Sequence, residues 1–123
     1  MQLKGIVVRG RGWGRKLGYP TANLDASVPD GLLPGVYVGF VLFPHGRHPA
    51  LIVVGAIPEV KTPSVEVHLL DWDGDLYGTE LAVEIQKKIT DIETLDSEEE
   101  LKEKIAFDIA IARGYFSASN SKL

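Results

Sequence analysis

The chain has 123 residues, 45% of them hydrophobic and 24% charged, with no cysteine and a formal net charge of −4. This length fits one domain with a modest core, and the missing cysteines exclude a disulfide framework and a thiolate zinc site. The acidic balance argues against a general nucleic-acid binder, and no apolar run reaches the roughly 20 residues of a membrane span. We therefore expect a cytoplasmic monomer that binds small molecules, and neither nucleic acid nor membrane.

Positive charge is concentrated at the start of the chain, where the first 20 residues hold no carboxylate. After a predicted strand over residues 3–9, residues 10–23 are too rich in glycine and proline for a helix or a regular strand. Backbone N–H groups of such a loop can converge on phosphate oxygens, whereas a mobile basic hairpin loop explains the composition equally well. The candidate nucleotide-binding residues of this loop are Gly10, Arg11, Gly12, Gly14, Arg15, Lys16 and Gly18.

Thr21 and Asn23 follow this loop and lie two residues apart. In an extended segment that spacing places both side chains on one face. A hydroxyl and an amide oxygen are hard, neutral ligands, suited to Mg²⁺ that is held mainly by phosphates and water. The alternative is a turn in which Asn23 caps its own backbone.

The middle of the chain alternates apolar and polar residues as β-strands do. The acidic run Asp71, Asp73 and Asp75 lacks the terminal glutamate of an EF-hand loop, so a solvated turn is expected there. The pattern predicts strands over residues 35–43, 49–54, 64–71 and 79–88, with turns at 44–48 and 73–74.

One carboxylate interrupts the apolar alternation of the strand predicted at residues 64–71. Val65 and Val67 share one face of that strand, and Glu66 and His68 share the other. A carboxylate in this position either faces water or serves a site. In the second case the Glu66 and His68 pair can bind a proton or a metal.

The end of the chain predicts one helix. Ser97 and Glu100 form a capping box at its start, Gly114 is expected to end it, and Lys104 is expected to pair with Glu100. Asp108 falls near the apolar side of the helix, where a structural role is expected. The domain is predicted to span residues 1–116, followed by a flexible tail at 117–123.

The order of these elements limits the fold. Several short strands followed by a single helix lack the alternation of a βαβ pattern, which excludes a Rossmann sheet. A small antiparallel barrel with the helix packed against it is favoured, because closure removes exposed strand edges.

Several ordered motifs resemble the riboflavin kinase family, which also forms the C-terminal module of bacterial bifunctional FAD synthetases. Residues 18–23 (Gly-Tyr-Pro-Thr-Ala-Asn) resemble its Pro-Thr-Ala-Asn signature, and residues 65–70 and 75–78 resemble its catalytic strand and the following turn. The resemblance covers roughly residues 5–113. It implies a mainly β fold, a six-stranded antiparallel Greek-key barrel with one C-terminal α-helix.

The resemblance also implies a reaction, the transfer of the γ-phosphate of ATP to the 5′-hydroxyl of riboflavin, which gives FMN and ADP. By that match Glu66 is the general base, and Thr21 and Asn23 hold Mg²⁺ or another divalent cation together with the nucleotide phosphates. The glycine loop then folds over the nucleotide, and Pro20, Thr21 and Tyr77 join the nucleotide-binding residues.

The chain departs from the family pattern after its last predicted strand, where Thr90 stands at the position of a usual arginine. By position, Thr90, Glu93 and Ser97 are the candidates for flavin contacts. The His-x-Gly-His motif of the adenylyltransferase is absent, so the chain is expected to stop at FMN, as a standalone enzyme or as a module. The alternatives are a non-catalytic flavin- or nucleotide-binding barrel and a related kinase with a different nucleotide donor.

Overall fold

The computed structural model describes residues 1–8, 21–26, 28, 31–56, 63–72, 74–92 and 97–120. Within these ranges the chain forms strands first and a long helix last, as the sequence predicts. The elements are β1 (Gln2–Val8), β2 (Ala22–Ala26), β3 (Gly35–Phe43), β4 (Gly46–Ala56), β5 (Pro63–Leu69), β6 (Glu80–Thr90) and α2 (Glu98–Asn120).

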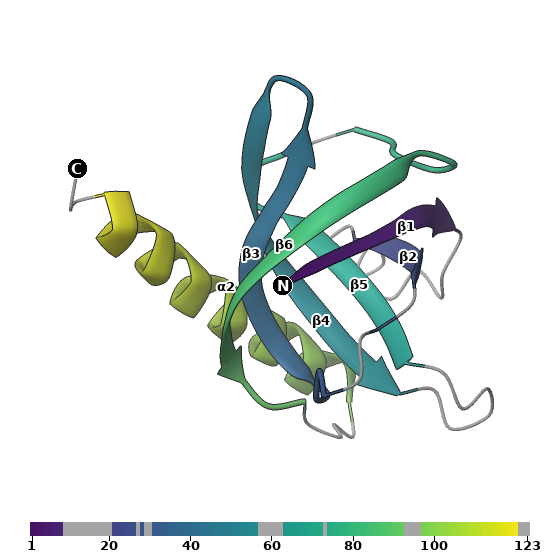
Figure 1. Cartoon of the computed structure of the whole chain (residues 1–123). Helices are drawn as coiled ribbons and strands as arrows, with labels where there is room; N and C mark the ends of the chain where they lie inside the picture. The colour runs from purple at the N-terminus through teal and green to yellow at the C-terminus, as the bar shows by residue number, and fades with distance from the viewer. Residues whose placement is uncertain are drawn as a thin grey trace.

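The strands close into an antiparallel barrel in the order β1-β2-β5-β4-β3-β6 (Figure 1). β3, β4 and β5 follow one another as neighbours, and β6 returns to lie beside β3, which is the strand order of a Greek key. Closure pairs each strand on both sides. The predicted six-stranded Greek-key barrel with a C-terminal helix is therefore confirmed.

Every second side chain of the strands fills the inside of the barrel, because successive residues of a strand point to opposite faces. In β5 this places Val65 and Val67 inside and leaves Glu66 and His68 on the outer face. The inner core consists of Leu3, Val7, Leu24, Tyr37, Val41, Ala50, Ile52, Val54, Val65, Val67, Leu69, Leu81, Val83 and Ile85.

The helix covers the outer face of β3, β4 and β6 (Figure 1). Its start is set by the predicted cap, since the backbone N–H of Glu100 donates to Ser97 Oγ at 3.1 Å. A second apolar cluster lies between helix and barrel. Its buried members are Val36, Val38, Leu51 and Leu70 from the barrel side and Ile109, Ala112 and Phe116 from the helix.

Gly114 does not end the helix, so this prediction is wrong. α2 continues to Asn120, and residues 117–120, which were predicted as part of a tail, are helical. Phe116 explains the extension, because its ring is buried and meets Phe40 edge-on at 5.3 Å between centroids. Packing of an apolar face outweighs the low helix propensity of one glycine.

Most other strand boundaries differ from the prediction by one to three residues, and β2 and the first turn differ in kind. β2 was expected only as an extended segment, yet it pairs with both β1 and β5. The first turn is shorter than the predicted range 44–48, because Pro44 and His45 alone form it and β4 already begins at Gly46. Gly46 has a φ of 149°, a region that favours glycine and permits so tight a connection.

Candidate active site

Asn23 of β2 and Glu66 of β5 are direct cross-strand partners. Facing residues of an antiparallel pair point to the same side, with Cβ atoms roughly 5 Å apart. Their neighbours Leu24 and Val65 lie in the inner core, so Asn23 and Glu66 share the outer face, where both are half-buried. Because Asn23 belongs to this ladder, the alternative of a turn capped by its own side chain is excluded.

The pairing extends on both sides of Asn23 and Glu66 into one row of outward-facing positions, which we call the cross-strand row. Each step of the row joins two residues that are paired across neighbouring strands, and neighbouring strands lie about 4.8 Å apart. Glu66 and Thr90 are three steps apart, so roughly 14 Å separates their backbones along the surface. In order around the barrel, the row consists of Val8, Asn23, Glu66, Val53, Val36 and Thr90.

The two sides of Glu66 differ in chemistry. On one side lie the amide of Asn23 and then Val8, which directly precedes the segment predicted to bind phosphate. On the other side lies Val53, which is partly exposed and gives the row an apolar floor, followed by Val36, which is buried beneath the helix. Glu66 therefore stands at the border between a polar and an apolar half of one surface.

Ile92, shortly after β6, lies over the outer face of β4. A Cβ atom placed on Gly55 would be 3.4 Å from Cδ1 of Ile92, so this side chain occupies the space above the glycine. Gly55 and Val53 share the outer face, because they are two residues apart in β4. Ile92 thus borders the apolar floor of the cross-strand row.

Thr90 ends the cross-strand row in a buried network with the helix. Its hydroxyl donates to Oδ1 of Asp108 at 2.9 Å and accepts from Nζ of Lys104 at 3.0 Å. Lys104 also donates to both carboxylate oxygens of Asp108, at 2.7 and 2.6 Å. The two charged side chains are only 13% and 5% exposed. The sequence predicts a pair of Lys104 with Glu100; the structure shows its ammonium group in contact with Asp108 and Thr90.

Tyr77 lies in a turn that is fastened to the end of β1. The backbone N–H of Gly78 donates to the carbonyl of Val7, and the N–H of Val7 donates to the carbonyl of Thr79, both at 2.9 Å. The N–H of Tyr77 itself donates to Oδ1 of Asp75 at 2.9 Å. The ring of Tyr77 is exposed at the end of the barrel from which the predicted glycine loop departs.

Of the remaining predicted site residues, Thr21 and Ser97 lie within the described ranges and the others do not. Thr21 is half-buried directly before β2, two residues from Asn23, whereas the Ser97 hydroxyl accepts from the helix backbone as its N-cap. Within the described ranges, no cluster of three or more His, Cys, Asp or Glu side chains could hold a metal. The predictions for Gly10, Arg11, Gly12, Gly14, Arg15, Lys16, Gly18, Pro20 and Glu93 lie outside the described residues.

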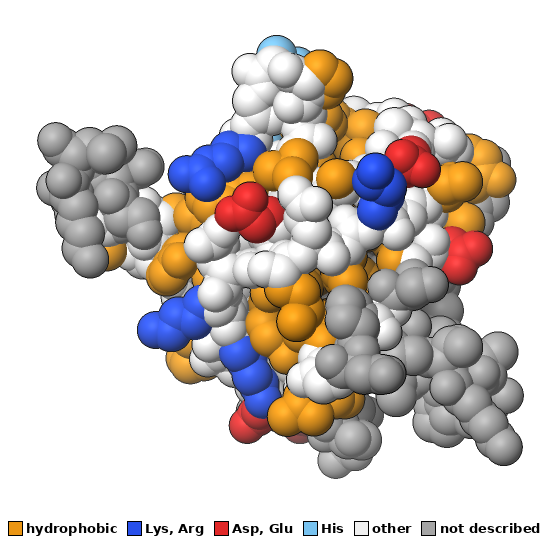
Figure 2. Space-filling view, viewed as in Figure 1, with side chains coloured by type: hydrophobic (Ala, Val, Ile, Leu, Met, Phe, Trp, Pro, Cys, Tyr) orange, Lys and Arg blue, Asp and Glu red, His pale blue; other side chains and the backbone are white. Residues whose placement is uncertain are grey.

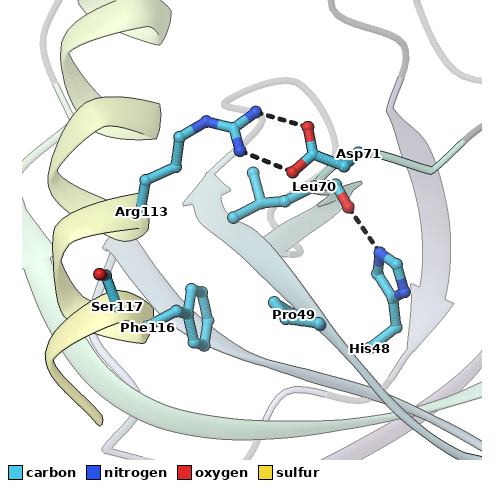
Figure 3. Close-up of a pocket in the computed structure, with 7 residues that line it drawn as sticks. All are labelled: His48, Pro49, Leu70, Asp71, Arg113, Phe116 and Ser117. Carbon is cyan, nitrogen blue, oxygen red and sulfur yellow. Dashed lines mark hydrogen bonds and ion pairs between the residues drawn. The ribbon is translucent and has the colours of Figure 1, made fainter. Parts of the chain in front are cut away.

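A separate hollow of about 430 Å³ lies at the other end of α2 (Figure 3). Arg113 spans its rim with two hydrogen bonds to Asp71, at 2.6 and 2.8 Å, and these bonds hold the pKa of the Asp71 carboxyl below its ordinary value. His48, to which the sequence assigned no role, bonds through Nε2 to the carbonyl of Leu70 at 2.6 Å. No predicted site residue lines this hollow, so it is distinct from the cross-strand row.

The surface seen in Figure 2 carries its basic and acidic side chains singly or in small groups among apolar and neutral ones. A continuous basic surface is not formed on this face by the side chains that the structure describes. Among the described helical residues, no stretch is both long and apolar enough to traverse a lipid bilayer.

Comparison with known proteins identifies similar chains. A family model described as riboflavin kinase matches residues 1–116. The chain is 37% identical over 111 residues to the RNA-binding riboflavin kinase RibR of Bacillus subtilis, covering 88% of this chain and 48% of that protein. It is 38% identical over 117 residues to the bifunctional riboflavin kinase/FMN adenylyltransferase of Escherichia coli K12, covering 93% and 37%. The chain thus spans about half, or less, of the length of these relatives.

Two solved structures share the fold. A Streptococcus pneumoniae protein described as a macrolide-efflux protein superposes with a TM-score of 0.80 at 30% identity, over 91% of this chain and 38% of the other. The riboflavin kinase of Trypanosoma brucei superposes with a TM-score of 0.63 at 24% identity, over 94% and 79%. The second likeness supports the barrel architecture alone.

Proposed function

The chain belongs to the riboflavin kinase family, and on that premise we propose that it transfers the γ-phosphate of ATP to the 5′-hydroxyl of riboflavin. The observation that carries the proposal is the position of Glu66 between Asn23 and Val53 in the cross-strand row. A phosphate-bearing donor and an apolar acceptor must meet at one point, and the row offers a polar and an apolar half with a carboxylate at their border.

Glu66 acts in this proposal as the general base. A primary alcohol is a poor nucleophile near neutral pH, so a carboxylate within hydrogen-bond reach of its proton assists the attack. The hydroxyl oxygen forms a bond to the γ-phosphorus as the bond from that phosphorus to the bridging oxygen breaks. The products are FMN and ADP, and the alcohol proton passes to the Glu66 carboxylate.

The donor side of the row suits a metal–nucleotide complex. Thr21 and Asn23 contribute neutral oxygen ligands, and Mg²⁺ prefers such ligands when substrate phosphates and water complete its shell. The lack of an acidic or histidine cluster among the described side chains fits a cation that arrives with the nucleotide rather than one held by the protein alone. When bound, the cation neutralises charge on the transferring phosphoryl group. Gly10, Gly12, Arg15 and the other loop residues stay predicted phosphate contacts.

The acceptor side of the row suits the flavin ring. Val53 forms an apolar floor beside Glu66, and Ile92, which follows β6, borders it. A ring placed over this floor directs its ribityl chain back toward Glu66. Alignment of two substrates in this way supplies a large part of the rate enhancement of phosphoryl transfer.

The test is a product assay with the whole chain. Incubation with riboflavin, ATP and Mg²⁺, followed by chromatography, is expected to yield FMN and not FAD. Parallel reactions with CTP and GTP identify the donor. Flavin binding without any FMN would overturn the kinase proposal and favour the non-catalytic barrel. A cytoplasmic location, a monomeric state and a domain of residues 1–116 stay predictions from the sequence.

A further inference from the structure

His68 follows Glu66 by two residues in β5 and shares its outer face. The two Cα atoms lie roughly 7 Å apart, because a strand rises about 3.4 Å per residue. Aromatic and long side chains reach across a distance of this size. Both side chains are half-buried, so the imidazole and the carboxylate can meet at the surface of the barrel.

The end of β5 gives His68 a rigid support. Its cross-strand partner is Leu51, and both Leu51 and Leu70 are buried in the cluster beneath α2. The backbone beyond His68 is tied to β4. The N–H of Leu70 donates to the carbonyl of Pro49 at 3.1 Å, and the carbonyl of Leu70 accepts from His48 Nε2 at 2.6 Å. A side chain on such a support is able to hold a second side chain in place.

His68 also lies near Asp71, which follows the end of β5. Hydrogen bonds from Arg113 are the main cause of the lowered pKa of the Asp71 carboxyl, and the charges of His48 and His68 add to the effect. His68 therefore stands between two carboxylates of the chain, Glu66 before it and Asp71 after it. An imidazole carries at least one N–H in either charge state, so His68 can donate to a carboxylate beside it.

A general base must hold its carboxylate within hydrogen-bond reach of the alcohol proton, and the described neighbours of Glu66 differ in their ability to hold it. Val53 has no polar side-chain atom, and Asn23 is assigned to the metal in the proposed function. Ser64, two residues before Glu66, has a side chain too short to span roughly 7 Å. Its Oγ lies 3.2 Å from a Cβ placed on Gly55, so it is directed toward β4. Among these described neighbours, the imidazole two residues further along β5 is the donor with sufficient reach.

We propose that His68 is a positioning residue whose imidazole N–H donates to one oxygen of the Glu66 carboxylate and directs the other oxygen at the 5′-hydroxyl of riboflavin. The inference rests on the proposed function, in which Glu66 takes the alcohol proton. His68 touches neither substrate in this arrangement and takes no proton. It therefore contributes to the chemical step and not to substrate binding.

A double-mutant cycle of His68 and Glu66 tests this role. The kcat for FMN formation is expressed per site that binds Mg²⁺ with a non-hydrolysable ATP analogue, counted by calorimetry, so unfolded protein does not enter the value. His68→Leu is expected to lower kcat roughly 10-fold, the scale of one hydrogen bond to a charged group. The KM values for ATP and riboflavin are expected to stay within about twofold.

The same substitution in the Glu66→Gln background distinguishes a positioning role from a structural one. His68→Leu is expected to have little further effect there, because His68 acts through the carboxylate that this background lacks. A merely structural role of His68 would lower kcat by the same factor in both backgrounds.

His68→Gln separates hydrogen bonding from packing. Its amide keeps an N–H donor and is expected to retain more of kcat than His68→Leu, although leucine packs better beside Leu51 and Leu70. A packing role predicts the opposite order of the two variants. Ser64→Ala is the matched control, since Ser64 lies two residues from Glu66 in the other direction on the same face. This control is expected to leave kcat unaltered.

Three results would overturn the inference, namely a near-normal kcat of His68→Leu, an equal loss of kcat in both backgrounds, or a lower kcat for His68→Gln than for His68→Leu. In each of these cases wild-type protein still forms FMN, so the proposed function stands and only the role of His68 is refuted. If wild-type protein forms no FMN, the proposed function fails, and the role of His68 fails with it.

Discussion

Asn23 and Glu66 face each other across β2 and β5, although all of β3 and β4 separates them in the chain. The strand order of the barrel creates this contact, since β2 pairs with β5 rather than with β3. An amide suited to a metal–phosphate group and a carboxylate suited to a proton are thereby held on one rigid surface. Sites built on strands keep their geometry better than sites built on loops.

Replacement of Glu66 tests its role as the base. Glu66→Gln preserves the size of the side chain and removes its ability to take a proton, so kcat for FMN formation is expected to fall about 100-fold or more. Binding of Mg²⁺ with a non-hydrolysable ATP analogue, measured by calorimetry, is expected to stay within about twofold, because a general base contributes to the chemical step and little to ground-state binding.

Asp25→Asn is the matched control for this variant. Asp25 is an exposed carboxylate of β2, two residues from Asn23, and it pairs with Ile6 rather than with Glu66. The same change of carboxylate to amide on the same face of the sheet is expected to leave kcat unaltered. Near-normal turnover of Glu66→Gln would refute the assignment of the base.

Replacement of Asn23 tests the metal side of the site. Asn23→Ala removes the amide oxygen, so the Mg²⁺ concentration for half-maximal rate is expected to rise roughly 10- to 100-fold, the scale seen when a group that supports a metal is lost. The KM for riboflavin is expected to change little, since the proposed flavin position lies on the other side of Glu66. Gln86→Ala, which removes an exposed amide from β6, serves as control. An unchanged Mg²⁺ dependence would contradict the ligand role of Asn23.

Local patterns were sufficient to predict much of the fold. The strand at residues 35–43 matches β3 in both bounds, because an uninterrupted apolar run is bracketed by proline and glycine. The start of α2 follows from the cap at Ser97. The end of α2 could not be predicted from local sequence. Phe116 packs against the barrel, and this contact keeps the chain helical beyond Gly114.

The candidate site was only partly predictable. Alternation within one strand was enough to place Glu66 outside the core, whereas its register with Asn23 depends on closure of the barrel between distant segments. β2 carries no strong strand signal, since Asn23 and Asp25 are poor β-formers and only its pairing with β1 and β5 makes it a strand. The bonds between Thr90, Lys104 and Asp108 required the position of the helix on the barrel.

The bidentate pair of Arg113 and Asp71 predicts a dependence of stability on pH. Hydrogen bonds from Arg113 lower the pKa of Asp71 in the folded state. The pair therefore stabilises the folded state fully above the pKa of an unfolded aspartate, and this stabilisation is lost as pH falls through the lower folded pKa. Arg113→Ala is expected to lower the melting temperature slightly at pH 7, because both side chains are solvent-exposed and the pair is screened. This difference from wild type should vanish toward pH 2.

Arg113→Lys separates charge from geometry in that measurement. A lysine keeps the positive charge and cannot reproduce the two parallel hydrogen bonds of the guanidinium, so an intermediate melting temperature is expected at pH 7. A difference between Arg113→Ala and wild type that stays constant from pH 7 to pH 2 would show that packing of the arginine stem, and not the ion pair, accounts for the loss.

Two glycines predict opposite effects of the same substitution. A Cβ atom at Gly39 would collide with the backbone carbonyl of Glu84 and with Cδ1 of Ile52, where the pairing of β3 with β6 shifts register. Gly39→Ala is therefore expected to lower the free energy of unfolding by about 2 kcal/mol or more. Gly114 lies inside α2 with nothing within 4 Å of an added Cβ. Gly114→Ala is therefore expected to raise the free energy of unfolding by about 0.5–1 kcal/mol. Urea unfolding measures both values, and a destabilised Gly114→Ala would contradict a helix that continues through this position.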